Sequence, residues 1–208
     1  MALKIIEHPL IKDKMTRIRK KTTNMKVFKE NIQELTKLMA YEILSDIKLE
    51  EITIETPLAK TRGYKINENI VIIPVLRAGL AMVESILSLI PKAKVGHIGL
   101  YRDKVTLQPK EYFSKKPANT NGSYTLILDP MLATGRTAVA AISWVKSWGA
   151  SNIKLISLLG TKEGVTLISQ EHPDVDIYLA APLEKLDENC YISPGLGDAG
   201  DRYFGTND

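Results

Sequence analysis

The sequence predicts an α/β protein in which a central, mostly parallel sheet is covered by helices on both faces. Five short apolar runs have the continuous, β-branched composition of strands that are buried on both sides. Segments with apolar residues at helical spacing lie between most of these runs, and such alternation is typical of parallel sheets. A length of 208 residues suits one such domain, so we expect a single domain over the whole chain.

The first predicted element is an amphipathic helix over residues 27–44, within an N-terminal helical segment. Its apolar residues recur at spacings of three and four, as the buried face of a packing helix requires: Phe28, Ile32, Leu35, Leu38, Met39 and Ile43. Residues 70–76 are continuously apolar, which predicts a strand covered on both faces. Helical spacing follows from Leu80 to Ile90, so this strand is expected to lead into a helix.

The later elements follow the same alternation, with strands predicted at residues 95–100, 124–128, 153–159 and 175–181 and helices at 138–148 and 164–170. Residues 102–122 interrupt the pattern because they are polar and rich in Lys, which predicts an extended arm or lid. Open α/β sheets bind ligands at the carboxyl ends of their strands. The loops after Leu76, Leu100 and Leu128 are therefore the expected place for a site.

Composition excludes several classes of protein. Hydrophobic residues make up 44% and charged residues 25% of the chain, as in an ordinary soluble globular protein. The net charge of +4 suits an anionic ligand such as phosphate but is too small to indicate nucleic-acid binding. The single cysteine, Cys190, cannot form an internal disulfide and is expected to be inert. No signal peptide or apolar stretch of membrane length is evident, so we expect a cytoplasmic protein with no membrane partner.

The segment from Asp129 to Thr137 has the layout of a phosphate-binding loop. It joins a predicted strand to a predicted helix, so free backbone N–H groups at the helix start would face a bound anion. Gly135 allows the backbone to approach closely, and the hydroxyls of Thr134 and Thr137 can donate to phosphate or cap the helix. Asp129 would instead accept hydrogen bonds from sugar hydroxyls, which indicates a ribose phosphate as the ligand.

Two other interpretations of this loop compete with a ribose phosphate site. A kinase-type P-loop would need a glycine at Pro130 and a lysine at Arg136, so we reject it. An ordinary strand-to-helix turn with a threonine cap stays open on these residues alone.

The string from Gly195 to Gly200 matches the dinucleotide-binding pattern G-x-G-x-x-G, but its context does not. Pro194 precedes it and the chain ends at Asp208, which leaves no room for a βαβ unit. So many glycines can instead present bare backbone to a flat ligand. The three histidines, His8, His97 and His172, have no spacing typical of a metal site.

Several strings in the sequence resemble those of the uracil phosphoribosyltransferases. The most specific is DPMLATG at 129–135, and the others are PVLRAGL at 74–80, KVGHIGLYRD at 94–103, EGV at 163–165, HPDVDIY at 172–178 and YISPGLGDAGDRYFGT at 191–206. The resemblance runs in order from about Ile5 to the end of the chain. It implies the type I phosphoribosyltransferase fold and a pentosyl transfer of pyrimidine salvage. In that reaction uracil and 5-phosphoribosyl 1-diphosphate (PRPP) give UMP and diphosphate.

The resemblance also implies which residues hold PRPP. The 5′-phosphate would lie on the loop from Ala133 to Thr137, and the ribose hydroxyls would lie on Asp129. Arg77 and Arg102 would contact the diphosphate, while Mg²⁺ would be held by the diphosphate and water without a direct protein ligand. The full implied PRPP set is Arg77, Arg102, Asp129, Pro130, Met131, Leu132, Ala133, Thr134, Gly135, Arg136, Thr137 and Asp198.

Uracil would be held by a C-terminal segment at about 183–208 that forms a hood over the base. The resemblance assigns its contacts to Ile192, Gly197, Asp198 and Ala199. Cytosine reverses the donor and acceptor at two positions of the uracil edge, so it would leave buried groups unpaired and be rejected. Catalytic roles fall to Asp198 and Arg102, and the general base for uracil N1 is left open.

Members of the family form dimers or higher assemblies, and some are activated by GTP, so the resemblance implies a homodimer or homotetramer and a GTP effector. The sequence departs from the family at Gly135-Arg136-Thr137, where Gly-Gly-Ser is common, and at residues 160–164, which replace an Ala-Pro-rich version. Arg136 is expected either to tighten phosphate binding or to extend into solvent. Two rival functions on this fold stay open: a regulator that binds RNA and a nucleotide, and a nonenzymatic nucleotide sensor.

Overall fold

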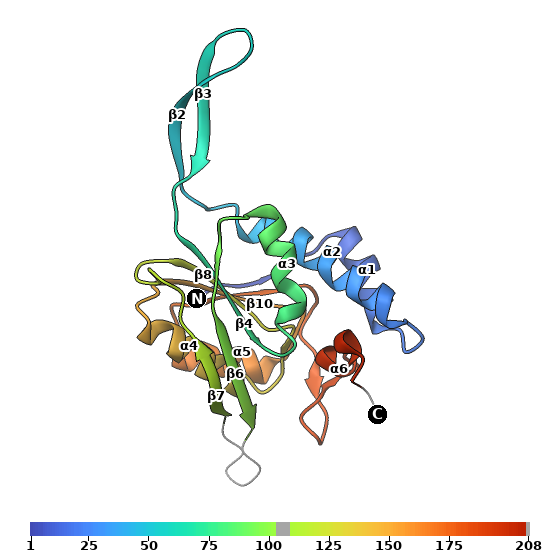
Figure 1. Cartoon of the computed structure of the whole chain (residues 1–208). Helices are drawn as coiled ribbons and strands as arrows, with labels where there is room; N and C mark the ends of the chain where they lie inside the picture. Colours follow the sequence, from blue (N-terminus) through green and yellow to red (C-terminus); the bar gives the residue numbers. More distant parts are fainter. Residues whose placement is uncertain (103–108, 207–208) are drawn as a thin grey trace.

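The computed structural model describes residues 1–102 and 109–206, with the backbone alone for Arg102, and it has helices on both faces of a central sheet (Figure 1). The helices are α1 (Pro9–Arg19), α2 (Met25–Ile43), α3 (Leu80–Leu89), α4 (Arg136–Ser147), α5 (Lys162–Glu171) and α6 (Ala199–Phe204). The strands are β1 (Leu3–Ile5), β2 (Leu49–Glu55), β3 (Lys60–Ile66), β4 (Ile70–Leu76), β5 (Lys94–Val95), β6 (His97–Arg102), β7 (Pro109–Lys115), β8 (Tyr124–Leu128), β9 (Met131–Leu132), β10 (Asn152–Ser157), β11 (Leu159–Gly160), β12 (Asp176–Leu179), β13 (Lys185–Leu186) and β14 (Ile192–Ser193). Within the described part, none of the helices is long and apolar enough to cross a membrane.

The main sheet contains eight strands in the order β1-β12-β10-β8-β4-β6-β7, with β5 pairing beside β4. Its neighbouring strands are parallel except β6 and β7, which are antiparallel. The predicted α/β class with a mostly parallel sheet is therefore confirmed. The predicted strand at 95–100 is divided at Gly96 between β5 and β6, and the other predicted elements end within a few residues of the observed ones.

Two apolar cores form because successive side chains of a buried strand point to opposite faces of the sheet. Ile72 and Leu126 belong to the core that α1, α2 and α3 cover. Val71 and Ile127 belong to the core that α4 and α5 cover. Coverage of both faces explains why the central strands are buried, and mostly apolar, along nearly their whole length.

Part of the segment predicted as an arm or lid is regular structure. Pro109–Lys115 form strand β7, which pairs antiparallel with β6, so the predicted interruption of the sheet pattern at 102–122 is wrong at these residues. β7 is an edge strand with mostly exposed side chains, and its first residue is a proline, which is why its sequence lacks the apolar pattern of a central strand. Residues 103–108 lie outside the described residues, and a lid role for residues 102–122 stays a prediction.

A second hairpin, formed by β2 and β3, projects from the rest of the fold at the top of Figure 1. Its side chains are largely solvent-exposed, and Leu58 near its turn is 96% exposed. The sequence analysis missed this hairpin because its few apolar residues alternate with charged ones and give no continuous run. A two-stranded hairpin without a further strand is only marginally stable in water on its own.

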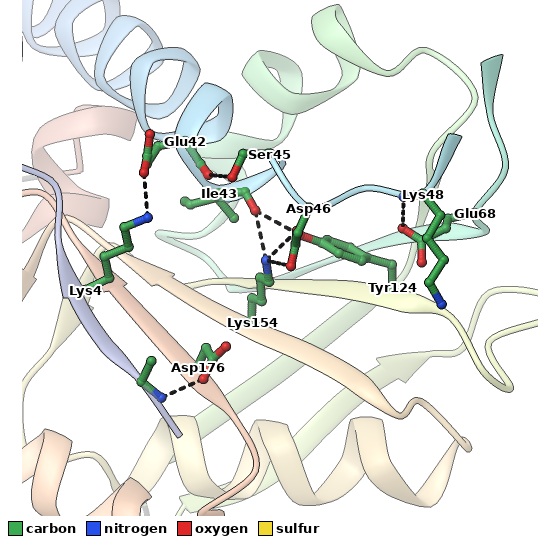
Figure 2. Close-up of polar contacts among 11 residues, drawn as sticks. Lys4, Glu42, Ile43, Ser45, Asp46, Lys48, Glu68, Tyr124, Lys154 and Asp176 are labelled. Atoms are coloured by element: carbon green, nitrogen blue, oxygen red, sulfur yellow. Dashed lines mark hydrogen bonds and ion pairs between the residues drawn. The ribbon is translucent and has the colours of Figure 1, made fainter. Parts of the chain in front are cut away.

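A buried lysine ties helix α2 to the sheet (Figure 2). Lys154 on β10 has a 4% exposed side chain, and its Nζ donates to both carboxylate oxygens of Asp46 at 2.8 Å and to the carbonyl of Ile43 at 2.9 Å. The hydroxyl of Tyr124 lies 2.8 Å from the same carboxylate and 2.9 Å from the same carbonyl. Burial raises the pKa of Asp46, but the hydrogen bonds from Lys154 and Tyr124 outweigh it and hold the pKa below its usual value. Side chains from β8 and β10 thus donate hydrogen bonds to the C-terminal end of α2, where the last carbonyls lack partners within the helix.

Removing Asp46 is expected to destabilise the protein more than removing Lys154. Asp46→Ala leaves the buried Lys154 ammonium with the Ile43 carbonyl as its remaining hydrogen-bond acceptor and no counter-ion, and we expect a loss of about 3 kcal/mol. Lys154→Met replaces the buried charge with an apolar chain and leaves Asp46 able to reach water, because that carboxylate is 57% exposed. We expect this second loss to be below about 1 kcal/mol. Urea unfolding at neutral pH measures both, and a larger loss for Lys154→Met would contradict this account of the network.

Candidate functional site

The segment predicted to bind phosphate leads from β8 through β9 into α4. Gly135 is the N-cap of α4, has φ of +79°, and makes no side-chain capping hydrogen bond. A Cβ at this position would lie 2.8 Å from the carbonyl oxygen of Gly164, so a side chain is excluded by space as well as by backbone conformation. The first N–H groups of α4 are therefore not capped by a side chain. The alternative of a threonine-capped turn would require such a cap.

A cavity of about 260 Å³ opens at this loop, lined by Pro109, Ala133, Thr134, Arg136, Thr137, Asn189, Cys190 and Tyr191. Three of the predicted phosphate contacts, Ala133, Thr134 and Thr137, thus share one cavity with the turn between β13 and β14. Arg136 lines it too, and its side chain is exposed. A loop that leads into the N-terminus of a helix, beside a cationic side chain, is suited to binding an anion.

Asp129 follows β8 directly, at the carboxyl end of the sheet. Its Oδ1 accepts a hydrogen bond from the backbone N–H of Met131 at 3.3 Å. Burial raises the pKa of Asp129 from 3.8 to about 6, although the Met131 hydrogen bond acts in the opposite direction. The carboxylate is only partly exposed and forms no salt bridge within the described residues. An unpaired carboxylate in such a place can accept hydrogen bonds from ligand hydroxyls.

Thr161, which the sequence analysis did not single out, fixes the phosphate loop from the neighbouring strand end. It is fully buried and is the N-cap of α5, where its Oγ1 accepts from the N–H of Gly164 at 3.0 Å. The same hydroxyl donates to the carbonyl of Ala133 at 2.6 Å, and the backbone N–H of Thr161 donates to Leu132 at 3.1 Å. The departure from the family at residues 160–164 therefore includes a residue that holds the loop in place.

Thr161→Val is expected to lower stability by about 1–2 kcal/mol, because it removes a helix cap and leaves the Ala133 carbonyl without its hydroxyl donor. Thr161→Ser keeps the hydroxyl and is the matched control, with an expected loss below about 1 kcal/mol. Chemical denaturation of the two variants gives the comparison. Equal losses would mean that the hydroxyl stabilises this position no more than the methyl group does, which would contradict this account.

Arg77 begins the loop between β4 and α3, and the peptide bond that precedes it is cis. The loop lies against the end of β8, since a Cβ on Gly79 would be 2.2 Å from the carbonyl oxygen of Leu128. Nη2 of Arg77 donates to Oδ1 of Asp201 in α6 at 3.0 Å, and its side chain is 56% exposed. The predicted diphosphate loop therefore adjoins both the strand end that carries Asp129 and the C-terminal segment.

The backbone of Arg102 ends strand β6, next to β4 in the sheet. Its side chain is outside the described residues, so its predicted contact with the diphosphate stays a prediction.

The C-terminal segment contains the β13–β14 hairpin and α6. Ile192 and Ala199 are buried, Gly197 has φ of +81°, and Asp198 is the N-cap of α6, accepting from the N–H of Asp201 at 2.8 Å. The strand before the glycine string has two residues and pairs antiparallel, so the string lies outside any βαβ unit. A Cβ on Gly200 would be 3.7 Å from that of Ala78, which places α6 against the loop that begins with Arg77.

Two arginines that the sequence analysis missed anchor this segment. Arg19 forms a salt bridge with Glu184 and donates to the carbonyl of Gly195 at 3.0 Å, while the N–H of Gly195 donates to Glu184 at 2.7 Å. Arg202 donates to the carbonyls of Ile18 and Leu196 at 2.5 Å and of Lys20 at 3.0 Å. Except for Leu196, the partners of these arginines lie more than 160 residues away in the sequence, so no local pattern could have identified them.

The comparisons with known proteins agree along nearly the whole chain. A family model described as uracil phosphoribosyltransferase matches residues 5–206. The uracil phosphoribosyltransferase of Mycoplasma capricolum is 52% identical over 206 residues, covering 99% of this chain and 100% of the relative. That of Enterococcus faecalis is 53% identical over 203 residues, covering 97% of each.

Solved structures give the same picture of the fold. The AQ2163 protein from Aquifex aeolicus is 36% identical, with a TM-score of 0.93 and coverage of 99% of both chains. A hypoxanthine phosphoribosyltransferase from Trypanosoma cruzi, in complex with IMP, has a TM-score of 0.52 at 14% identity, covering 81% of this chain and 88% of that one. The second similarity shows a shared fold alone.

Proposed function

Because this chain belongs to the uracil phosphoribosyltransferase family, we propose how its residues divide the work of the reaction. The chain is a pentosyltransferase of pyrimidine salvage that converts uracil and PRPP to UMP and diphosphate. Positive charge develops on ribose C1 as diphosphate leaves. The residues therefore act mainly by orientation and by stabilisation of charge, and less by covalent catalysis.

The 5′-phosphate is assigned to the loop from Ala133 to Thr137, with Pro130, Met131 and Leu132 as the turn that leads to it. The support is the cavity at this loop and the uncapped first turn of α4. Asp129 accepts hydrogen bonds from the ribose hydroxyls and fixes the position of C1. Arg136 is assigned to the phosphate because its side chain lines the same cavity as Thr134 and Thr137.

The diphosphate is assigned to Arg77 and Arg102, at the ends of two adjacent strands. Arg77 supports this role because a half-exposed guanidinium offers several N–H donors to phosphate oxygens. We propose that Mg²⁺ arrives with the diphosphate and neutralises part of its charge. Within residues 1–102 and 109–206, no group of three or more His, Cys, Asp or Glu side chains could hold a metal ion, and a magnesium ion bound through phosphate and water does not need such a cluster.

Uracil is assigned to Ile192, Gly197, Asp198 and Ala199, where the backbone can meet the donor and acceptor groups along the base edge. Asp198 faces both base and sugar in this assignment, and it shares a catalytic role with Arg102. Support comes from the contact of α6 with the Arg77 loop, which brings the proposed base and diphosphate sites together.

The convergence of Asp129, the phosphate loop, the Arg77 loop and the C-terminal segment at one edge of the sheet carries this proposal. The test is to incubate the protein with Mg²⁺, PRPP and one base at a time: uracil, cytosine, hypoxanthine, adenine or orotate. UMP formation with uracil, and little product from the others, is expected. A different preferred base would refute the uracil assignment, and binding without product would favour a nucleotide sensor.

A homodimer or homotetramer is also proposed, and the projecting β2–β3 hairpin supports it. Leu58 and Tyr64 on that hairpin are 96% and 65% exposed, and a second copy of the chain could bury them. A cytoplasmic location is proposed because PRPP and UMP are charged metabolites that do not cross membranes unaided. A GTP effector stays a prediction from the family resemblance.

A further inference from the structure

Arg77 meets a carboxylate that has no assigned role in the reaction. Oδ1 of Asp201 accepts from Nη2 of Arg77 at 3.0 Å and from the hydroxyl of Thr206 at 2.6 Å. Nη1 of Arg77 is also 3.4 Å from the Thr206 hydroxyl. The three side chains form a closed triangle between the Arg77 loop and the end of α6.

This triangle contributes little to the stability of the fold. The side chains of Arg77 and Asp201 are 56% and 33% exposed, and exposed ion pairs typically contribute less than about 1 kcal/mol. The triangle has a larger effect on the direction in which the Arg77 side chain points. An unpaired arginine samples many rotamers, whereas a guanidinium bonded at two nitrogens is confined to few. Donors of Arg77 that do not face Asp201 or Thr206 remain free for another anion.

We propose that Asp201 is a positioning residue, which holds the Arg77 guanidinium in the direction that the diphosphate of PRPP requires. The proposal rests on the proposed role of Arg77 in the diphosphate site. It also links the two halves of the active site, because the backbone N–H of Asp201 holds the carboxylate of Asp198 at 2.8 Å. The position of Arg77 and that of the uracil segment are therefore fixed by one residue of α6.

A role of Asp201 through its charge and a role through the orientation of Arg77 predict opposite effects on PRPP binding when Asp201 is removed. Asp201 is an anion beside a site for an anion, so if its charge alone mattered, removing it would strengthen PRPP binding. If it positions Arg77, removing it weakens PRPP binding in spite of the gain in positive charge. The hydrogen bond from Thr206 and the salt bridge to Arg77 keep the Asp201 pKa below its usual value, so the carboxylate is ionised at neutral pH.

The experiment measures steady-state KM values for PRPP and for uracil in the full-length enzyme. Asp201→Ala is expected to raise the KM for PRPP about tenfold, the effect of losing one charge-assisted hydrogen bond. Asp201→Asn keeps an acceptor for Arg77 and is expected to restore most of this loss. The KM for uracil should change less, because the backbone N–H that holds Asp198 is kept. Asp13→Ala removes the same charge from an exposed pair with Arg17 in α1 and is the control.

A double-mutant comparison separates this inference from the role of Arg77 itself. In an Arg77→Ala background, Asp201→Ala is expected to have no further effect on the KM for PRPP, because Asp201 acts through that guanidinium. If Arg77→Ala leaves this KM unchanged, the assignment of Arg77 to the diphosphate fails. If Arg77→Ala raises it and Asp201→Ala leaves it unchanged or lowers it, the positioning role of Asp201 is overturned while the site assignment holds. If Asp201 had a purely structural role, Asp201→Ala would lower the melting temperature without changing the KM for PRPP. That result would also overturn the proposal.

Discussion

Asp129→Asn is expected to lower kcat/KM for PRPP about 100-fold and, at the same time, to make the ligand-free protein more stable at neutral pH. The loss of activity follows because an ionised carboxylate accepts hydrogen bonds from two ribose hydroxyls, and a neutral amide accepts them more weakly. The gain in stability follows because burial raises the pKa of Asp129 to about 6, so ionising this group in the folded protein costs free energy.

The sign of the pH dependence follows from the same shift. Between pH 3.8 and about 6 the folded state retains a proton on Asp129 that the unfolded state has lost. Stability of the native protein therefore falls as pH rises through this window, and the Asn variant lacks that loss. A rise in pKa of this size corresponds to about 3 kcal/mol. Since Asp129 is partly exposed, we expect the variant to gain about 1–2 kcal/mol above pH 6 and nothing below pH 4.

Urea unfolding of both proteins across this pH range, with kinetics at pH 8, checks both halves of the expectation. Asp13→Asn is the control, because it removes a carboxylate from an exposed pair on α1. A stability difference that does not grow between pH 4 and 7 would show that Asp129 is not desolvated. Unchanged kinetics would remove it from the ribose site.

Gly79→Ala is expected to destabilise the protein by about 3–5 kcal/mol, although its backbone conformation suits alanine. A Cβ on Gly79 would lie 2.2 Å from the carbonyl oxygen of Leu128 and under 3 Å from the backbone N and O of Val75. All three contacts are backbone atoms of adjacent central strands, so no side chain can rotate away. The loop that carries Arg77 would have to move away from Asp129, which would lower activity in any protein that still folds.

Gly122→Ala provides the comparison for this prediction. Gly122 has φ of +67° with open space around it, so alanine there adds backbone strain of about 1–2 kcal/mol and no clash. Denaturant unfolding of both variants should show the larger loss for Gly79→Ala. If Gly79→Ala left the stability unchanged, the loop that carries Arg77 would have to lie farther from the ends of β4 and β8 than the structure places it.

The sequence predicted those parts of the fold in which the apolar residues follow the pattern of a single kind of element, a buried strand or an amphipathic helix. The central strands are buried on both faces, so Ile70–Leu76 is apolar at every position and Tyr124–Leu128 at all but Thr125, and α2 has a clear apolar face. The β2–β3 hairpin and β7 were missed because most of their side chains are exposed, so burial does not impose an apolar pattern on their sequences.

The candidate site divides in the same way. Loops at strand ends were predictable because a parallel sheet brings the carboxyl ends of neighbouring strands to one edge, so Arg77 and Asp129 were expected there. Thr161, Arg202 and Asp201 were not identified, because each acts through contacts made only in the folded chain. Thr161 caps a helix while it holds a loop on another strand, and Arg202 donates to carbonyls about 180 residues away.

A crystal structure with UMP and diphosphate bound tests most directly whether these segments form one active site. The account predicts the 5′-phosphate on Ala133 to Thr137, the ribose hydroxyls within hydrogen-bonding distance of Asp129, and the base edge on the backbone of the C-terminal segment. Diphosphate should lie beside the guanidinium of Arg77. UMP bound elsewhere, for instance in the cavity of about 560 Å³ between Lys4–His8 and α2, would contradict it.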